Sequence, residues 1–375
     1  MIEFDSSAMA IKGLVMSEVN ITSGCSIGHL AKNINFGEIT DFSFTKDASF
    51  TLGAEGFFIS CIIALARSNK LGKIKLHLRR TDLEQHGLRD DNYLSSPSMI
   101  NICIQDVRIY DKSEIDVTDL LTEMVSNAVN MDYGAFEGGQ AYSLYALDPY
   151  FIHPPFLNLG NSEPTETDFK CALAPRIQEC MFGDTAAARG SLDHITNSMS
   201  LYVLLKEIWE NTIHHARSTK VSLRYIKVSK VIYNNTQQIQ STEIPEALRR
   251  YLSYRLEKEG TKKYLIIDIV DSGTGIYETL KGNLPGLSKT EVVKLAFEKN
   301  STSKIQRQPI SRGLGLFSAM ECAKKLKGMV IMTTSGTLCV NYDYAEDKFL
   351  SDTQVFDMNI PVDNLSTSLS LIIPA

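Results

Sequence analysis

The chain has 375 residues, of which 43% are hydrophobic and 22% are charged, an ordinary globular composition that excludes disordered and fibrous proteins. This length accommodates roughly two or three domains. The formal net charge is only -6, and no run of Lys or Arg exceeds two residues, so the sequence does not indicate a nucleic-acid partner.

The sequence carries no sign of export or membrane insertion. Its longest strongly apolar stretch, Gly56 to Ala66, is shorter than the roughly 20 residues that a membrane-spanning helix needs. The first residues are acidic, whereas a secretory signal begins with basic ones. Seven scattered cysteines show no paired spacing, which is typical of reduced thiols. We therefore expect a cytoplasmic protein without a membrane segment.

Residues 1–90 are predicted to form a small α/β unit. Residues 33–44 alternate in polarity as a strand does, the apolar run 57–66 has the length of a helix, and 73–78 alternates again. This strand–helix–strand order resembles the central part of STAS-like domains. Residues 91–189 stay unassigned.

Residues 190–375 are predicted to form an α+β sandwich, because their helices and strands follow one another without strict βαβ alternation. The predicted helices span 198–216, 245–259 and 318–326, the predicted strands span 221–228, 264–270 and 367–373, and a predicted hairpin over 329–342 turns at Ser335-Gly336. Residues 229–263 are predicted to be an insertion.

Glu207 and Asn211 lie four residues apart on the polar side of the 198–216 helix. A carboxylate can orient or deprotonate a water molecule, and an amide oxygen is a hard ligand of the kind that Mg²⁺ prefers. The same spacing also occurs in solvent-facing pairs on ordinary amphipathic helices. The pair alone therefore leaves both interpretations open.

A short glycine-containing sequence, Asp271-Ser-Gly-Thr-Gly275, follows the strand predicted over 264–270. An Asp at the end of a strand can accept a hydrogen bond from the exocyclic amine of a base. The glycines allow the backbone to turn tightly against a flat ligand, because they have no Cβ. A simple strand-to-loop turn is the alternative interpretation.

A second glycine-containing sequence, Arg312-Gly-Leu-Gly-Leu316, directly precedes the helix predicted over 318–326. Glycines at this place leave backbone N–H groups free to point at a phosphate, aided by the helix dipole. A helix cap or a hinge is the alternative interpretation. The sequence matches neither a Walker loop nor a Rossmann fingerprint.

Taken in this order, the three patterns resemble the GHKL superfamily of ATP-binding domains, which includes gyrase B, the large heat-shock chaperones, sensor histidine kinases and mismatch-repair ATPases. E-I-W-E-N-T-I-H-H-A, which contains Asn211, is similar to that family's N box, D-S-G-T-G-I to its first glycine box, and R-G-L-G-L to its second. The ending of the chain is similar to the family's closing Gly-Thr-strand-Pro element, with Ser366 where glycine is usual. The resemblance covers residues 190–375 and implies a Bergerat-type α/β sandwich.

The resemblance implies a role for each matching residue. Glu207 would be the general base that activates water for attack on the γ-phosphate of ATP, and Asn211 would coordinate Mg²⁺. Asp271 would read the adenine amine. The base pocket would be shaped by Gly273, Gly275 and Ile276, the phosphates would be held by Gly313, Leu314, Gly315 and Leu316, and Thr367 would belong to the closing element. Residues 276–311 would form a mobile ATP lid that is loosely packed without ligand.

The resemblance admits three functions. An ATP-hydrolysing conformational switch is favoured, and a serine- or histidine-directed protein kinase and a non-hydrolysing ATP-dependent binding module are the alternatives. A sensor kinase would carry a phosphorylated His followed by an acidic residue, Arg and Pro, and His194 lacks that context. A protein partner or a homodimer is expected from the habits of the family.

Overall fold

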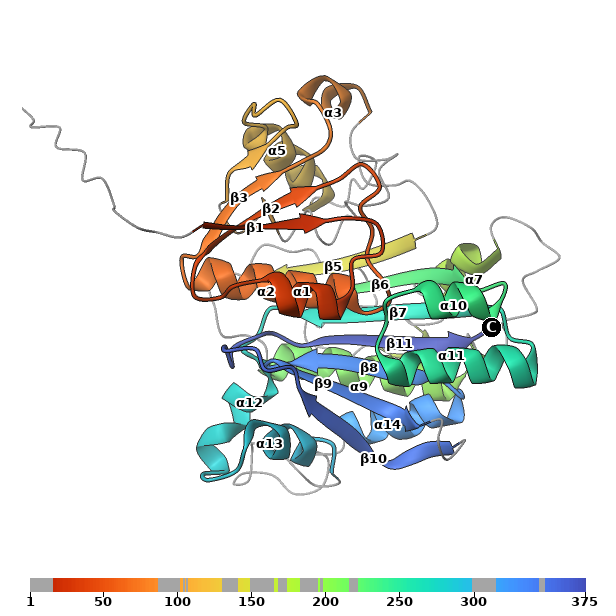
Figure 1. The fold of residues 1–375 in the computed structure, drawn as a ribbon. Coiled ribbons are helices and arrows are strands. Elements are labelled where there is room, and N and C mark those ends of the chain that lie inside the picture. The colour runs from red at the N-terminus through yellow and green to blue at the C-terminus, as the bar shows by residue number, and fades with distance from the viewer. Residues whose placement is uncertain are drawn as a thin grey trace, which may run out of the picture.

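The computed structural model describes most of the chain and shows two β-sheets with helices around them (Figure 1). The described residues are 16–86, 102–103, 105, 107–129, 141–148, 165–167, 174–182, 195, 198–215, 222–298, 315–343 and 348–375.

The N-terminal sheet is parallel, with its four strands in the order β1-β2-β3-β4. Its elements in chain order are β1 (Met16–Ile21), α1 (Ile27–Asn33), β2 (Ile39–Phe44), α2 (Ala54–Arg67), β3 (Leu71–Lys75), α3 (Arg80–His86), β4 (Ile109–Tyr110) and α5 (Thr118–Val129). The predicted strand–helix–strand order is confirmed as β2, α2 and β3. β2 starts later than predicted because Ser26 caps α1, its Oγ accepting from the His29 N–H at 2.9 Å, and α1 then runs to Asn33.

The C-terminal half contributes six strands to an antiparallel sheet, and β5 adds a seventh at one edge, giving the order β10-β9-β8-β11-β7-β6-β5. The strands are β5 (Ala141–Asp148), β6 (Ser222–Ile232), β7 (Lys263–Asp271), β8 (Met329–Thr334), β9 (Thr337–Asp343), β10 (Lys348–Asp357) and β11 (Ser368–Pro374). β5 comes from the region that the sequence left unassigned.

The helices of this half are α7 (Ala174–Phe182), α9 (Met199–His215), α10 (Thr236–Ser241), α11 (Glu246–Glu259), α12 (Gly275–Leu280), the 3₁₀ turn η3 (Lys281–Asn283), α13 (Lys289–Leu295) and α14 (Gly315–Lys325). The predicted helices α9, α11 and α14 and the predicted strands β6, β7 and β11 are confirmed, although α14 starts three residues before its predicted beginning. The predicted hairpin turns at Ser335 and Gly336, whose φ angles of 51° and 76° are those of a type I′ turn.

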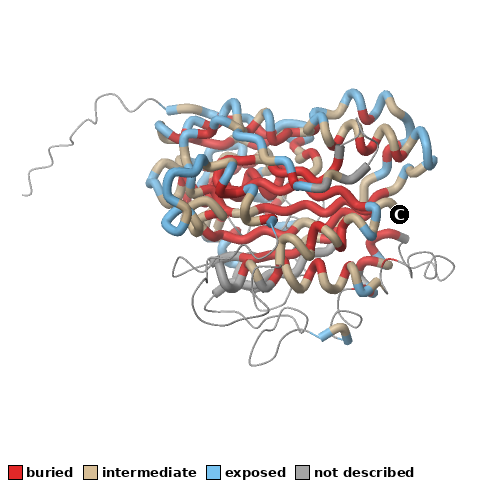
Figure 2. The backbone as a smooth tube through the Cα atoms, turned by 90° about the horizontal axis from the view of Figure 1, so that it is seen from below, coloured by how far each residue is buried: buried red, intermediate tan, exposed pale blue. Residues whose placement is uncertain are grey.

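Helices cover both faces of the antiparallel sheet, and the buried residues concentrate in the strands between them (Figure 2). On the face that we call the α9 face, side chains of α7, α9, α13 and α14 pack on alternate strand residues such as Ile267 and Leu371. On the opposite face, the α2 face, α2 and α11 pack on the residues in between, such as Ile266 and Ile372.

α2 is buried on every side, because it lies between the two sheets and packs on β3 as well as on β7 and β11 (Figure 1). All residues from Ala54 to Leu65 are buried, which explains why this run is apolar all round and lacks a polar stripe. In the part of the chain that the structure describes, no helix is long and apolar enough to cross a membrane.

A buried ion pair joins α2 to the antiparallel sheet. Lys227 Nζ on β6 donates to Glu55 Oε2 on α2, and their side chains are only 14% and 11% exposed. Asp268 on β7 accepts from the Ser370 hydroxyl beside this pair. Burial raises the pKa of the Asp268 carboxyl to about 6, although Ser370 and Lys227 act in the opposite direction. The docking of α2 therefore includes charges that water does not screen.

Removing one partner of this pair is expected to destabilise the fold strongly. Lys227→Met leaves the Glu55 carboxylate buried without its cation, so we predict a loss of about 3 kcal/mol in the free energy of unfolding, measured by urea denaturation. The double variant Glu55→Leu/Lys227→Met should recover most of that loss, because both charges are gone. Arg80→Met, which removes an exposed pair with Glu84, is the control and should change stability little. Equal losses in the single and double variants would contradict the pairing.

Candidate functional site

α9 carries the first two predicted site residues. Glu207 and Asn211 are both half-buried and lie one helical turn apart, while Trp209 and Leu205 point into the core of the α9 face. The polar pair therefore lies on a side of the helix that the core does not occupy. The Glu207 carboxylate and the Asn211 amide therefore lie side by side on the surface of α9.

Gly315, the first residue of α14, lies directly against this pair. A Cβ at position 315 would come within 2.9 Å of Asn211 Nδ2, 3.2 Å of Asn211 Oδ1 and 3.2 Å of Glu207 Oε2. Only glycine therefore fits at position 315 without displacing the ends of these two side chains. The structure thus brings together predicted residues that are more than a hundred positions apart in the sequence. Leu316 follows on α14 and packs at the border of the same core.

Asp271, at the end of β7, is buried and starts what we call the Asp271 loop (residues 271–277). Strand alternation places Asp271 on the α9 face, in line with Ile267 and Ile269. One carboxylate oxygen, Oδ1, accepts from the Gly273 N–H at 2.7 Å. The carboxylate thus shapes the turn, and it also has a hydrogen bond from the Thr367 backbone and the cations Arg67 and Arg224 nearby.

Burial raises the pKa of the Asp271 carboxyl to about 6, although the Gly273 and Thr367 hydrogen bonds and the cations Arg67 and Arg224 oppose this. The folded chain therefore takes up this proton more readily than the unfolded chain, in which the pKa is about 4. The contribution of this group to the free energy of unfolding consequently falls as the pH rises from about 4 to about 6, because ionising a buried carboxyl costs free energy.

A chain of hydrogen bonds connects the Asp271 loop with the end of the molecule. The Asp271 N–H donates to the Thr367 carbonyl at 3.0 Å, and the hydroxyl oxygens of Thr367 and Thr334 lie 3.1 Å apart. Thr334 also accepts from the Ile276 N–H at 3.0 Å. Gly275 has a φ of +83° and fits closely, because a Cβ there would come within 2.3 Å of the Leu365 carbonyl. Gly273, Gly275, Ile276 and Thr367 are therefore neighbours.

Two predictions for the remaining region have different outcomes. Gly313 and Leu314, and residues 299–311 of the predicted lid, lie outside the described residues. The described part of that lid, 276–298, is mostly exposed or half-buried, but three of its residues reach the core. It contains α12 and α13, with Val292, Val293 and Phe297 buried in the core, because these apolar residues return at helical spacing after a capping box at Ser288.

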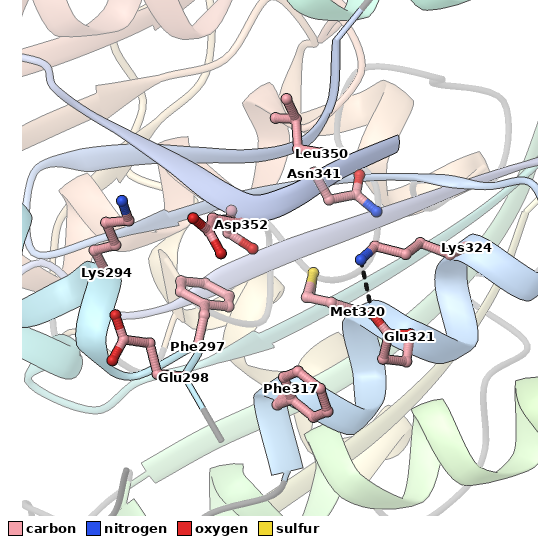
Figure 3. A pocket seen from close by; sticks show the side chains of 11 residues that line it. Lys294, Phe297, Glu298, Phe317, Met320, Glu321, Lys324, Asn341, Leu350 and Asp352 are labelled. Carbon is pink, nitrogen blue, oxygen red and sulfur yellow. Dashed lines mark hydrogen bonds and ion pairs between the residues drawn. The ribbon is translucent and has the colours of Figure 1, made fainter. Parts of the chain in front are cut away.

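A separate hollow of about 160 Å³ lies between α13, α14 and β10, and Figure 3 shows the side chains that line it. Phe297, Phe317 and Met320 give it apolar walls, and Lys324 on its rim pairs with Glu321 at 2.7 Å. The Asn341 amide nitrogen in its wall has no hydrogen-bond partner among the described residues. Glu207, Asn211, Asp271 and Gly315 do not line this hollow, so it is separate from the predicted site.

Sequence reasoning missed three side chains at the site. Thr334 and Ser335 at the β8–β9 turn accept from the N–H groups of Ile276 and Tyr277 at 3.0 Å each. Arg67 donates to the carbonyls of Ser272 and Gly273, the latter at 2.8 Å. No local pattern marks these residues, because their partners lie far away in the sequence.

Comparison with models of known protein families and with curated protein sequences finds no match to this chain.

We predict that Gly315→Ala impairs function far more than folding. The new Cβ collides with the movable ends of Asn211 and Glu207, so these side chains turn away at little cost, and the free energy of unfolding should change by no more than about 1 kcal/mol. Displacement of the pair should lower the ATP hydrolysis that the resemblance implies roughly 10–100-fold. Thermal unfolding and a phosphate-release assay measure the two effects. Gly282→Ala, at a position with open space around it, is the control, and equal activity in both variants would contradict the prediction.

Proposed function

We propose that this chain is a Mg²⁺-dependent ATP-binding and ATP-hydrolysing module of the GHKL type, which acts as a nucleotide-controlled conformational switch. The observation that carries the proposal is the position of Gly315 against Glu207 and Asn211. The N box and the second glycine box were recognised separately in the sequence, and their contact in space is what a shared phosphate site requires.

The chemistry assigned to this pair is water activation beside a phosphate. Glu207 accepts the proton of the attacking water, and Asn211 would hold Mg²⁺ through its amide oxygen. Gly315 lies against both side chains, so the start of α14 and its backbone N–H groups are next to the proposed metal and phosphate ligands. When bound, Mg²⁺ would neutralise charge on the phosphates, and catalysis would otherwise rest on positioning.

The base would bind at the Asp271 loop. The buried Asp271 carboxylate is an acceptor, which matches the exocyclic amine of adenine, whereas guanine presents a carbonyl at that place. Gly273 and Gly275 bring the backbone close, and Thr367 is held beside Asp271 by a backbone hydrogen bond. The unusual Ser366 does not disturb this arrangement, because its hydroxyl is turned towards Ser60 at 2.9 Å.

The finer fold assignments belong to this proposal. The antiparallel sheet that carries the motif residues on its α9 face supports a Bergerat-type sandwich for residues 190–375. The parallel β2–α2–β3 unit supports a STAS-like N-terminal unit. A protein partner or a second copy would then respond to the nucleotide state, and a cytoplasmic location is expected.

Phosphotransfer to a protein would use the same pocket, and so would ATP binding without hydrolysis. Measuring phosphate release and labelled-phosphate incorporation, each with and without a candidate acceptor protein, separates the three functions. Release without an acceptor supports the switch, whereas incorporation into the acceptor alone would make the chain a kinase.

Base discrimination provides a test of the Asp271 loop. ATP with Mg²⁺ should stabilise the chain against unfolding by about 2.7 kcal/mol at a concentration of 100 Kd, and GTP should do so poorly. Asp271→Asn places an amide that can donate where an acceptor is needed and should abolish the ATP effect, whereas the exposed Asp47→Asn should not. Equal thermal shifts with both nucleotides in the wild type would exclude this assignment.

Single substitutions on α9 separate binding from chemistry. Glu207→Ala should keep ATP affinity and lose roughly 10²–10⁴-fold in hydrolysis rate, because the base acts on water and touches the ground state little. Asn211→Ala should lose Mg²⁺-dependent binding itself. Calorimetric titration and a phosphate-release assay distinguish the two variants. If both hydrolyse ATP at the wild-type rate, the assignment of these residues is wrong.

A further inference from the structure

We propose that Arg67, at the C-terminal end of α2, is a positioning residue for the Asp271 loop, and that through it nucleotide affinity depends on how the N-terminal unit is docked. The first half of this inference concerns the loop alone. The second half rests on the proposed function.

Arg67 holds the loop by its backbone. One guanidinium nitrogen donates to the Gly273 carbonyl at 2.8 Å and the other donates to the Ser272 carbonyl. The planar guanidinium binds both carbonyls at once, a geometry that a single ammonium group cannot reproduce. Asp271 lies close enough for the charge of Arg67 to lower its pKa. The loop is therefore held by an internal hydrogen bond, from the Gly273 N–H to Asp271, and by the two hydrogen bonds that Arg67 donates from the N-terminal unit.

α2 reaches this position because it is seated closely on β7 and β11. A Cβ at Gly56 would lie 1.9 Å from Ser368 Oγ and 2.9 Å from Val270 Cγ2, so the helix backbone rests almost on the sheet. One turn further along α2, the Ser60 hydroxyl accepts from the Ser366 hydroxyl at 2.9 Å. α2 thus contacts both chain segments that enclose the predicted base pocket, the Asp271 loop and the segment before Thr367.

Through these contacts, the free energy of docking α2 is coupled to the free energy of nucleotide binding. If docked α2 favours the binding shape of the loop, then bound nucleotide favours docked α2 by the same factor. A partner or modification that shifts α2 would change affinity, and nucleotide would in turn change how firmly the N-terminal unit is held. No residue of α2 needs to touch the nucleotide for this coupling.

Hydrogen exchange of the nucleotide-free chain tests the first half. Arg67→Met keeps the length of the side chain and removes both donors, so the amides of Gly273, Ile276 and Tyr277 should exchange roughly tenfold faster, while those in the middle of β8 and β11 stay unchanged. Arg80→Met, an exposed position in the same unit, is the matched control. Gly56→Ala should have the same local effect, because it lifts α2 without altering Arg67. Wild-type exchange of the loop in Arg67→Met would overturn the inference.

Titration with ATP and Mg²⁺ tests the second half. Arg67→Met should weaken ATP binding roughly tenfold, at unchanged stoichiometry, with little change in kcat. The charged groups that face Asp271 are Arg67 from α2 and Arg224 from β6. In the wild type, binding should therefore weaken as the pH falls through about 6, where Asp271 gains its proton, and in Arg67→Met this midpoint should move to higher pH. Arg67→Lys keeps the cation and should restore the midpoint, but not the slow exchange of the loop.

The possible results separate this inference from the proposed function. Faster loop exchange in Arg67→Met together with no ATP binding by the wild type would support the clamp, refute the proposed function and remove the coupling. ATP binding by the wild type with the same affinity and pH midpoint in Arg67→Met would keep the proposed function and overturn the coupling. A general loss of folded protein, seen as lower stoichiometry at unchanged Kd, would likewise overturn it.

Discussion

The structure depends on one constraint, which is that α2 has no polar side to show to water. Every residue from Ala54 to Leu65 is buried, so the helix has to be enclosed completely, and the two sheets provide this enclosure. The one charge that it takes inside, Glu55, is matched by Lys227 of the facing sheet. The parallel unit and the antiparallel sheet are thereby parts of one packed body, and the end of α2 is fixed where Arg67 reaches the Asp271 loop.

The opposite face of the antiparallel sheet carries the residues to which we assign the chemistry. There α9 presents Glu207 and Asn211, α14 begins against them with Gly315, and β7 ends in the buried Asp271. Burying the Asp271 carboxylate costs free energy, and functional sites often retain a cost of this kind. The α9 face thus holds the residues to which we assign the reaction, and Arg67 of α2 binds the Asp271 loop from the other unit.

The sequence predicted those parts of the fold and site whose cause is local. The apolar run of α2, the continuously buried β7, the amphipathic α9 and the turn at Ser335-Gly336 all follow from neighbouring residues, and each is confirmed. Gly315 was predicted from its place before a helix, although its contact with Glu207 is a long-range result.

The remaining parts have causes that a local pattern does not contain. β5 is a strand because it pairs with β6 about eighty residues later. Arg67 looks like an ordinary cation in the last turn of a helix until the Asp271 loop is placed beside it.

The most direct measurement of the central claim is a crystal structure with Mg²⁺ and a non-hydrolysable ATP analogue. We predict the adenine amine against the Asp271 carboxylate and the metal at Asn211, and a nucleotide bound elsewhere, or none at saturating concentration, would contradict the account.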